Sequence, residues 1–337
     1  MKPFLDSSRV ISNGPELARR MKRDGYLFVR GLLPAEPLES LRMQFLEIAA
    51  ANGWISTRNA SLEEGVADLS GFCVEPEPKY MEVYEQFYQL QDFHALPHHP
   101  RILGLLERML GEPVIHHPRI IARFMFPRRN AYTTKAHQDF IPIQGTEETF
   151  TAWIPLSDLP EEMGGLQIAA GSHLGGVYDI KPALGAGGFE IAADLGDCWV
   201  GNSFRQGDVL FFHSLAAHRG VSNRGKRMRM SIDGRYQKRS DPITADSLSP
   251  HMGVDGLSWE EIYADWTSGE FQYYWKDWNP RIAEYDPSYF ERRDVLAMEM
   301  AEQGDEIARS TLQRIVARDQ NPEKRARAQS LLTRLDA

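Results

Sequence analysis

Apolar residues recur at helical spacing through the first third of the chain. Leu38, Leu41 and Phe45 stand three or four positions apart, so they share one face of a predicted helix over residues 37–51. Similar spacing, with Pro near the start or Gly near the end, predicts three more helices, at 15–23, 81–90 and 99–110. Residues 52–80 have no clear period, and we interpret them as a long loop near which a ligand could bind.

From residue 114 onward the pattern changes to short apolar segments separated by Gly, Pro and Asn residues. Together with an early strand at 26–30, strands are predicted at 114–117, 120–127, 133–140 and 149–156, and short strands continue to Tyr236. Such a series is typical of an antiparallel barrel or sandwich. Helices followed by strands place the chain in the α+β class.

The last hundred residues differ from the rest. Residues 238–290 are rich in Trp, Tyr, Pro and Asp and predict an extension that packs on the core, either over the barrel mouth or as a cover for apolar surface. Residues 294–335 predict two amphipathic helices joined at 318–323, a pair that resembles one HEAT-type helical hairpin. A single hairpin cannot bury its own apolar face, so it should dock on the core or on another subunit, for example in a homodimer.

Composition narrows the range of partners. The 337 residues carry a formal net charge of −9 and no long basic run, which argues against a nucleic acid or an anionic membrane as partner. Only Cys73 and Cys198 occur, with no metal-finger spacing, as expected for a reducing compartment. No stretch has the length and apolar character of a membrane span or a secretory leader. We therefore expect a soluble cytoplasmic protein.

The polar stretch 133–140 contains a candidate metal site. His137 and Asp139 are two positions apart, so on a strand both side chains leave the same face and can hold one ion. Two ligands rarely hold a catalytic metal alone, and a lone pair of this kind is equally compatible with a surface strand.

A second polar set follows some eighty residues later. Residues 223–226 predict a four-residue hairpin loop that pairs Gly220 with Arg229 and His218 with Ser231. In this register one face is polar and should line a cavity, with His218, Gly220, Arg229, Ser231, Asp233 and Arg235. The opposite face carries Met228, Met230, Ile232 and Tyr236, which the early helices should cover.

Other histidines and a basic cluster offer alternatives. His213 lies five residues before His218 but faces the other way on a regular strand, so His218 is the preferred third ligand. For four other histidines a turn, a helix cap or the surface is the simpler interpretation: His94, His98, His99 and His173. His116 and His117 are adjacent and face opposite ways on a strand, so they cannot easily bind one ion together. The basic residues Arg224, Lys226 and Arg227 are most simply a solvated hairpin tip.

Taken together, the motifs resemble those of the iron(II)- and 2-oxoglutarate-dependent oxygenases, and within them the phytanoyl-CoA dioxygenase-like group. The resemblance covers residues 25–237 and rests on His137-Gln138-Asp139, on Trp153 followed by residues 161–167 and 171–173, and on 207–218 with Arg229 eleven positions later. It implies a double-stranded β-helix, a cupin-like jelly-roll of two antiparallel sheets flanked by helices. The chain is then divided into an oxygenase domain at 1–237 (helical 1–113, jelly-roll 114–237), the extension at 238–290 and a C-terminal helical hairpin at 291–337.

The resemblance also assigns roles. It makes His137, Asp139 and His218 the iron ligands and catalytic centre, Arg229 the partner of the distal carboxylate of 2-oxoglutarate, and Trp153 and Met125 further residues of the cosubstrate pocket. Two imidazoles and one carboxylate suit an iron(II) site with open positions, and the planar fork of an arginine suits a carboxylate.

The implied reaction consumes O2 and 2-oxoglutarate, releases succinate and CO2, and can be stimulated by ascorbate. An aspartate at 139, where related halogenases have a small residue, favours hydroxylation, while desaturation and ring closure are compatible with the same site. Two alternatives remain at this point: a non-catalytic jelly-roll that binds a metal or ligand, and a cupin-type metalloenzyme that does not use 2-oxoglutarate.

Overall fold

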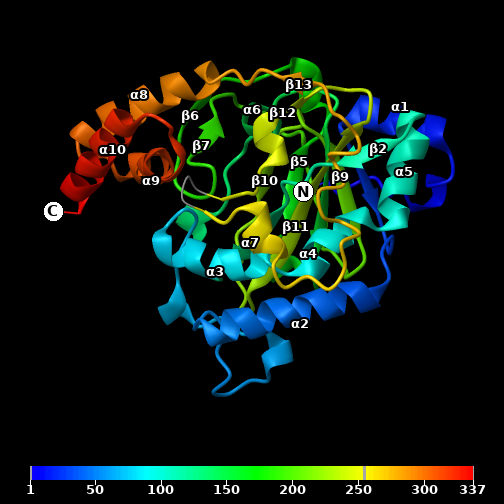
Figure 1. The fold of residues 1–337 in the computed structure, drawn as a ribbon, viewed down its shortest axis with the longest axis horizontal. Coiled ribbons are helices and arrows are strands. Elements are labelled where there is room, and N and C mark those ends of the chain that lie inside the picture. Colours follow the sequence, from blue (N-terminus) through cyan, green and yellow to red (C-terminus); the bar gives the residue numbers. More distant parts are fainter. Residues whose placement is uncertain (1, 253–255, 337) are drawn as a thin grey trace.

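A computed structural model describes residues 2–252 and 256–336, so Met1, residues 253–255 of the predicted extension and Ala337 lie outside the described residues. Its centre is a double-stranded β-helix (Figure 1). The large antiparallel sheet has the order β1-β9-β4-β11-β2, and β3 also pairs with β11. Its strands are β1 (Tyr26–Val29), β2 (Val114–His116), β3 (Ile121–Met125), β4 (Phe150–Pro155), β9 (Val209–His213) and β11 (Arg229–Lys238).

A smaller antiparallel sheet, in the order β10-β5-β8, completes the β-helix. Its strands are β5 (Leu166–Ala169), β8 (Trp199–Val200) and β10 (His218–Gly220). Apolar side chains from both sheets, including Trp153, Phe212 and Ile168, form a cluster inside the β-helix. Two further pairs lie outside these sheets, β6 (Ile180–Pro182) with β7 (Phe189–Ile191), and β12 (Ile243–Thr244) with β13 (Ile282–Ala283).

The predicted helices of the first third are present. They are α1 (Gly14–Asp24), α2 (Ala35–Ala51), α3 (Pro78–Tyr88) and α5 (Pro100–Leu110), and a short α4 (Gln91–Ala95) was not predicted. The start of α1 is set by Asn13, whose side chain accepts a hydrogen bond from the Glu16 N–H, and its end by Gly25 in the left-handed conformation. At Gly25 a side chain would also collide with the ring of His173, so only glycine fits there.

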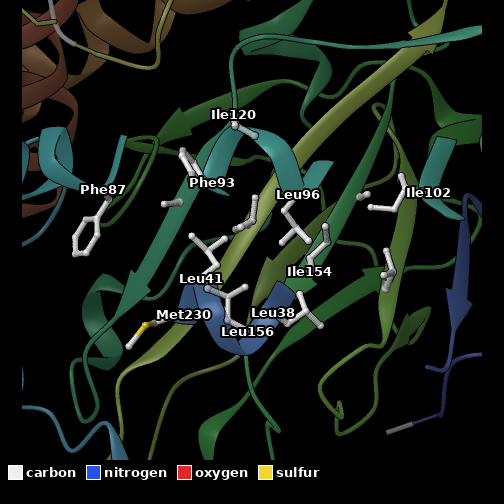
Figure 2. Close-up of a cluster of buried hydrophobic side chains, with 14 of the residues drawn as sticks. Leu38, Leu41, Phe87, Phe93, Leu96, Ile102, Ile120, Ile154, Leu156 and Met230 are labelled. Carbon is white, nitrogen blue, oxygen red and sulfur yellow. The ribbon is translucent and has the colours of Figure 1, made fainter. Parts of the chain in front are cut away.

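These helices cover the outer face of the large sheet, as the sequence predicted. Leu38 and Leu41 of α2 lie in one buried cluster with Ile154 of β4 and Met230 of β11 (Figure 2). Phe87 of α3 stacks on Phe124 of β3 with ring centroids 4.1 Å apart. Each fully buried large side chain contributes about 1.5–3 kcal/mol, so this helix–sheet interface is a main source of stability.

The prediction that β10 and β11 pair with each other as a hairpin is wrong. Strand β10 belongs to the small sheet and pairs with β5, placing His218 opposite Ile168, whereas β11 pairs with β3 and β4 in the large sheet, placing Arg229 opposite Met125. The connection crosses between sheets instead of closing a two-stranded turn. The predicted polar face of β11 nevertheless points inward, because Arg229, Ser231 and Asp233 line one cavity together with His218 of β10.

The aromatic-rich extension contains α7 (Trp259–Tyr263) and packs against the helices and the end of the large sheet. The Trp266 indole donates a hydrogen bond to the Gln89 carbonyl, and the Tyr274 hydroxyl donates to the His116 carbonyl. No described residue of 238–290 lines the cavity of the β-helix. The contacts therefore favour the interpretation of this segment as a cover for apolar surface.

The described C-terminal region has three helices where two were predicted: α8 (Ser288–Glu302), α9 (Arg309–Arg318) and α10 (Pro322–Leu335). The predicted first helix is interrupted near Gly304, which has a φ of +78° and ends the helical run. The three helices share a small apolar cluster of their own at one end of the molecule (Figure 1). They also dock on the core, since Ser310 accepts a hydrogen bond from the Gly185 N–H and Arg314 and Arg318 of α9 pair with Glu75.

Within the described ranges, no helix is long and apolar enough to cross a membrane.

Candidate active site

His137, Asp139 and His218 converge in the interior of the β-helix. The Oδ1 atom of Asp139 lies 3.8 Å from Nε2 of His137 and 3.8 Å from Nε2 of His218. One nitrogen or oxygen atom from each of the three residues lies within 4.8 Å of the others. The pair from residues 133–140 and the histidine eighty residues later therefore meet, as the sequence analysis expected.

The local backbone around the pair differs from the predicted strand. His137 forms only an isolated antiparallel bridge, in which its N–H and carbonyl exchange 2.9 Å hydrogen bonds with those of His218. Asp139 is already helical in its backbone and precedes the short helix α6 (Phe140–Ile143). The bridge aligns the two histidines directly, and the turn into α6 brings the carboxylate back toward them.

Backbone carbonyl groups orient both imidazoles. Nδ1 of His137 lies 2.8 Å from the Lys135 carbonyl oxygen, and Nδ1 of His218 lies 3.0 Å from that of Ala216. A carbonyl oxygen only accepts, so each Nδ1 carries the proton and each Nε2 presents a lone pair toward Asp139. Burial, followed by the neighbouring imidazole, lowers the pKa of His137 to about 3, and burial lowers the pKa of His218. Both rings are therefore neutral at neutral pH, the form that binds metal.

Two residues hold the carboxylate of Asp139. The Thr151 hydroxyl on β4 donates a 2.6 Å hydrogen bond to Oδ2, and Nη2 of Arg235 on β11 lies 3.4 Å from Oδ1. Burial opposes ionisation of Asp139, but the Arg235 guanidinium, together with the Thr151 hydrogen bond, outweighs it and holds the pKa of this carboxyl well below its usual value. Thr151 was not predicted as a site residue, because a threonine in an apolar strand carries no signal of its own.

The donor set suits iron. Two neutral imidazole nitrogens and one carboxylate oxygen are the ligands that a non-haem iron(II) site with open positions requires. The three side chains are buried or nearly so, yet both histidines line a cavity through which other ligands can reach the centre. The cluster therefore fits the implied metal in chemistry, charge and access.

The three residues expected at the cosubstrate pocket, Arg229, Trp153 and Met125, line the same cavity as the two histidines. Nη1 of Arg229 donates to the carbonyl oxygens of Gly165, at 3.1 Å, and Val221, at 2.8 Å. Burial lowers the pKa of Arg229 to about 10, so the guanidinium stays charged at neutral pH. Among the described residues no carboxylate lies within ion-pair distance of it, which leaves a buried cation facing a cavity.

Other parts of the cavity wall include the long loop, which was predicted to lie near a ligand, and Asp233, which was predicted to face a cavity, but also Arg123, which was given no role. Residues 72–75 of the long loop, Arg123 of β3 and Asp233 of β11 contribute to it. The loop had been predicted to lie near a ligand, but its pattern did not identify Glu75. Arg123 and Glu75 were missed because isolated charged residues in a strand or a loop are most often exposed.

The alternative histidines lie elsewhere. Phe212 lines the cavity, so its neighbour His213 points to the opposite face of β9, where Nε2 lies 3.5 Å from Glu148. The ring centroids of His173 and His213 lie 5.3 Å apart, and Nε2 of His173 is hydrogen-bonded to the Lys22 carbonyl oxygen. His94, His98, His116 and His117 likewise have hydrogen-bonding or aromatic partners away from the three site residues.

The sequence matches a known family and several characterised relatives. The phytanoyl-CoA dioxygenase (PhyH) family model matches residues 21–231, well over half of the chain. The 1-deoxypentalenic acid 11-beta-hydroxylase of Streptomyces exfoliatus is 27% identical over 286 residues, which cover 80% of this chain and 94% of the relative. A probable phytanoyl-CoA dioxygenase of Caenorhabditis elegans is 20% identical over 268 residues, or 73% of this chain and 80% of the relative.

Among solved structures, the chain is similar to the non-heme alpha ketoglutarate dependent carbocyclase SnoK from nogalamycin biosynthesis. That likeness has a TM-score of 0.48 and 22% identity and covers 72% of this chain and 89% of the other. The family model spans His137, Asp139 and His218 as well as Arg229. The chain belongs to the phytanoyl-CoA dioxygenase family and is an iron(II)- and 2-oxoglutarate-dependent dioxygenase.

Proposed function

We propose that this dioxygenase hydroxylates a small organic molecule, with His137, Asp139 and His218 as the iron ligands and Arg229 as the anchor of 2-oxoglutarate. The observation that carries the proposal is the convergence of two neutral imidazoles and a carboxylate, with an unpaired guanidinium lining the same cavity as the two imidazoles. Hydroxylation as the outcome is supported by the Streptomyces exfoliatus relative, which is a hydroxylase. Iron bound at this site would supply the oxidising chemistry, coupled to the conversion of 2-oxoglutarate and O2 into succinate and CO2.

The protein's own part is binding, orientation and exclusion of water. The carbonyl groups behind the two imidazoles and the Thr151 hydroxyl behind Asp139 fix the ligand atoms before the metal arrives. Arg229, held by two carbonyl oxygens, is already placed for a carboxylate, so little side-chain entropy is lost on binding. Trp153 and Met125 supply apolar surface beside this cation.

The proposal is tested by 2-oxoglutarate turnover in wild type and an Arg229→Ala variant. Purified wild type given iron(II), ascorbate and 2-oxoglutarate should form succinate. A charge-assisted hydrogen bond contributes about 1.5–3 kcal/mol, so the KM for 2-oxoglutarate should rise about 10–100-fold in Arg229→Ala, and high 2-oxoglutarate should restore part of the rate.

The matched control is Arg224→Ala, which changes an exposed arginine in the connection between β10 and β11 and should leave this KM unchanged. No succinate under any iron loading would contradict the proposed function. An unchanged KM in Arg229→Ala would contradict the assignment of the anchor.

Thr151→Val is expected to weaken iron binding about 10–100-fold, because the hydroxyl that orients the Asp139 carboxylate is lost at nearly constant volume. Thr149→Val is the matched control: its hydroxyl is also buried and hydrogen-bonded, but to the Thr146 carbonyl outside the cavity. Equilibrium dialysis of iron(II) under argon measures both affinities. Equal loss of affinity in the two variants would mean that Thr151 acts on stability and not on the metal site.

A further inference from the structure

A second arginine of the cavity, Arg123 of β3, is held in place without using all of its hydrogen-bonding capacity. Its Nε lies 3.0 Å from Oδ2 of Asp233, and its Nη1 lies 3.3 Å from Oε2 of Glu75. The remaining nitrogen, Nη2, has no hydrogen-bond partner among the described residues. The side chain nonetheless lines the cavity and keeps 24% of its surface exposed.

The charges around Arg123 do not cancel. Glu75, the carboxylate on its far side, also pairs with Arg314 and Arg318 of α9, at 2.9 and 3.0 Å. Two carboxylates and three guanidinium groups thus form one connected network that carries an excess positive charge. Because α9 holds Glu75 from outside, the guanidinium of Arg123 is fixed from two sides before any ligand binds.

The rest of the cavity wall is largely apolar. Phe72, Phe126, Tyr132 and Leu166 line it together with Phe212 and Trp153. Arg229 is the cation that the proposed function assigns to 2-oxoglutarate, so Arg123 is left for a different ligand. A rigid arginine with one open nitrogen, in an apolar cavity with surplus positive charge, suits a carboxylate on a hydrocarbon skeleton.

We propose that Arg123 is a specificity-determining residue that receives the carboxylate of an apolar organic acid as the oxidised substrate. The inference rests on the proposed function for the reaction itself, but not for the binding event. The guanidinium anchors one end of the substrate by a charge-assisted hydrogen bond from Nη2. The aromatic wall then contacts the hydrocarbon part beside the iron ligands.

The test compares carboxylic acids with their uncharged methyl esters as probes. Cyclohexanecarboxylic acid, 1-adamantanecarboxylic acid and dodecanoic acid, each with its methyl ester, are titrated calorimetrically into protein held under argon with iron(II) and 2-oxoglutarate. In wild type at least one acid should bind about 10-fold or more tightly than its ester, which is the effect of one charge-assisted hydrogen bond. Arg123→Gln should abolish that preference and leave the Kd for 2-oxoglutarate unchanged.

Two further variants keep the result interpretable. Arg123→Lys preserves the charge beside Asp233 and Glu75 and should fold even if Arg123→Gln does not, with a reduced but measurable preference for the acid. Arg129→Gln removes an exposed arginine that also lines the cavity and stacks on Phe72, and should keep the full preference.

The inference is overturned if no acid is preferred over its ester in wild type, or if the preference survives in both Arg123 variants. It is also overturned if the preference disappears with Arg129 instead, or if Arg123→Gln weakens 2-oxoglutarate binding as much as acid binding. Succinate formation by wild type is measured separately. A protein that binds the acids through Arg123 but makes no succinate would contradict the proposed function and leave only the binding role of Arg123 standing.

Discussion

His218→Ala is expected to lose iron-dependent succinate formation by more than about 100-fold, whereas His213→Asn, five residues earlier, should stay within a few-fold of wild type. Loss of a residue that merely supports a metal ligand typically lowers affinity or activity about 10–100-fold, and loss of a ligand should cost more. His218 shares its centre with His137 and Asp139, while His213 points to the other face of β9. Asparagine at 213 can still accept the hydrogen bond that the Leu215 N–H donates there.

The measurement is succinate formation from 2-oxoglutarate, with iron(II) binding followed by equilibrium dialysis. Both histidines are buried, so the unfolding midpoints of both variants should be compared first. Loss of iron binding in His213→Asn with retention in His218→Ala would reverse the assignment of the third ligand.

Glu75→Gln is expected to lower the free energy of unfolding by about 3–5 kcal/mol at pH 7, because it removes the carboxylate that compensates three guanidinium groups in a buried network. Burial opposes ionisation of Glu75, but Arg314, Arg318 and Arg123 outweigh it and lower its pKa from 4.5 to about 2. That difference alone corresponds to about 3 kcal/mol. Both arginines of α9 would also lose their anchor, so the C-terminal helices should loosen from the core.

The contribution of Glu75 to the free energy of unfolding depends on pH in a defined direction. The pKa of Glu75 is lower in the folded state, so its stabilising contribution is fully present above about pH 4.5 and is lost as the pH falls toward 2. The difference in urea unfolding between wild type and Glu75→Gln should therefore be constant near neutrality and shrink below pH 4.5. Glu82→Gln, an exposed glutamate on α3, is the control and should change stability by less than about 0.5 kcal/mol. Equal destabilisation by the two variants would contradict a stabilising role for the network.

The local sequence pattern was sufficient to predict which segments form helices or strands in most of the chain, and to predict the principal site residues. The helical period of residues 37–51 and the alternation along β11 are short-range signals, and the side chains they place on one face do lie on one face. The motif around His137 and Asp139, with His218 and Arg229, depends on residue types at given separations in the chain. For that reason the sequence predicted the set of residues that meet in the cavity.

The pairing of the strands and the backbone conformation around His137 depended on contacts between distant parts of the chain, which a local sequence pattern does not predict. Residues 133–140 predicted a strand, but the chain forms a single bridge, between His137 and His218 of β10, and then turns into α6. The turn at 223–226 predicted a hairpin, but closure of the β-helix assigns its two arms to different sheets. Turn residues permit a reversal of the chain, whereas the neighbouring strands decide which hydrogen bonds form.

The sequence by itself therefore determined the fold class, the inward polar face and the three residues that converge as a metal site. Only the tertiary structure decided what surrounds them: Thr151 behind Asp139, and Arg123 held between Asp233 and Glu75. The physical reason is separation along the chain. Glu75 and the arginines of α9 stand some 240 positions apart, and a buried ion pair between them exists only because α9 packs against the loop that carries Glu75.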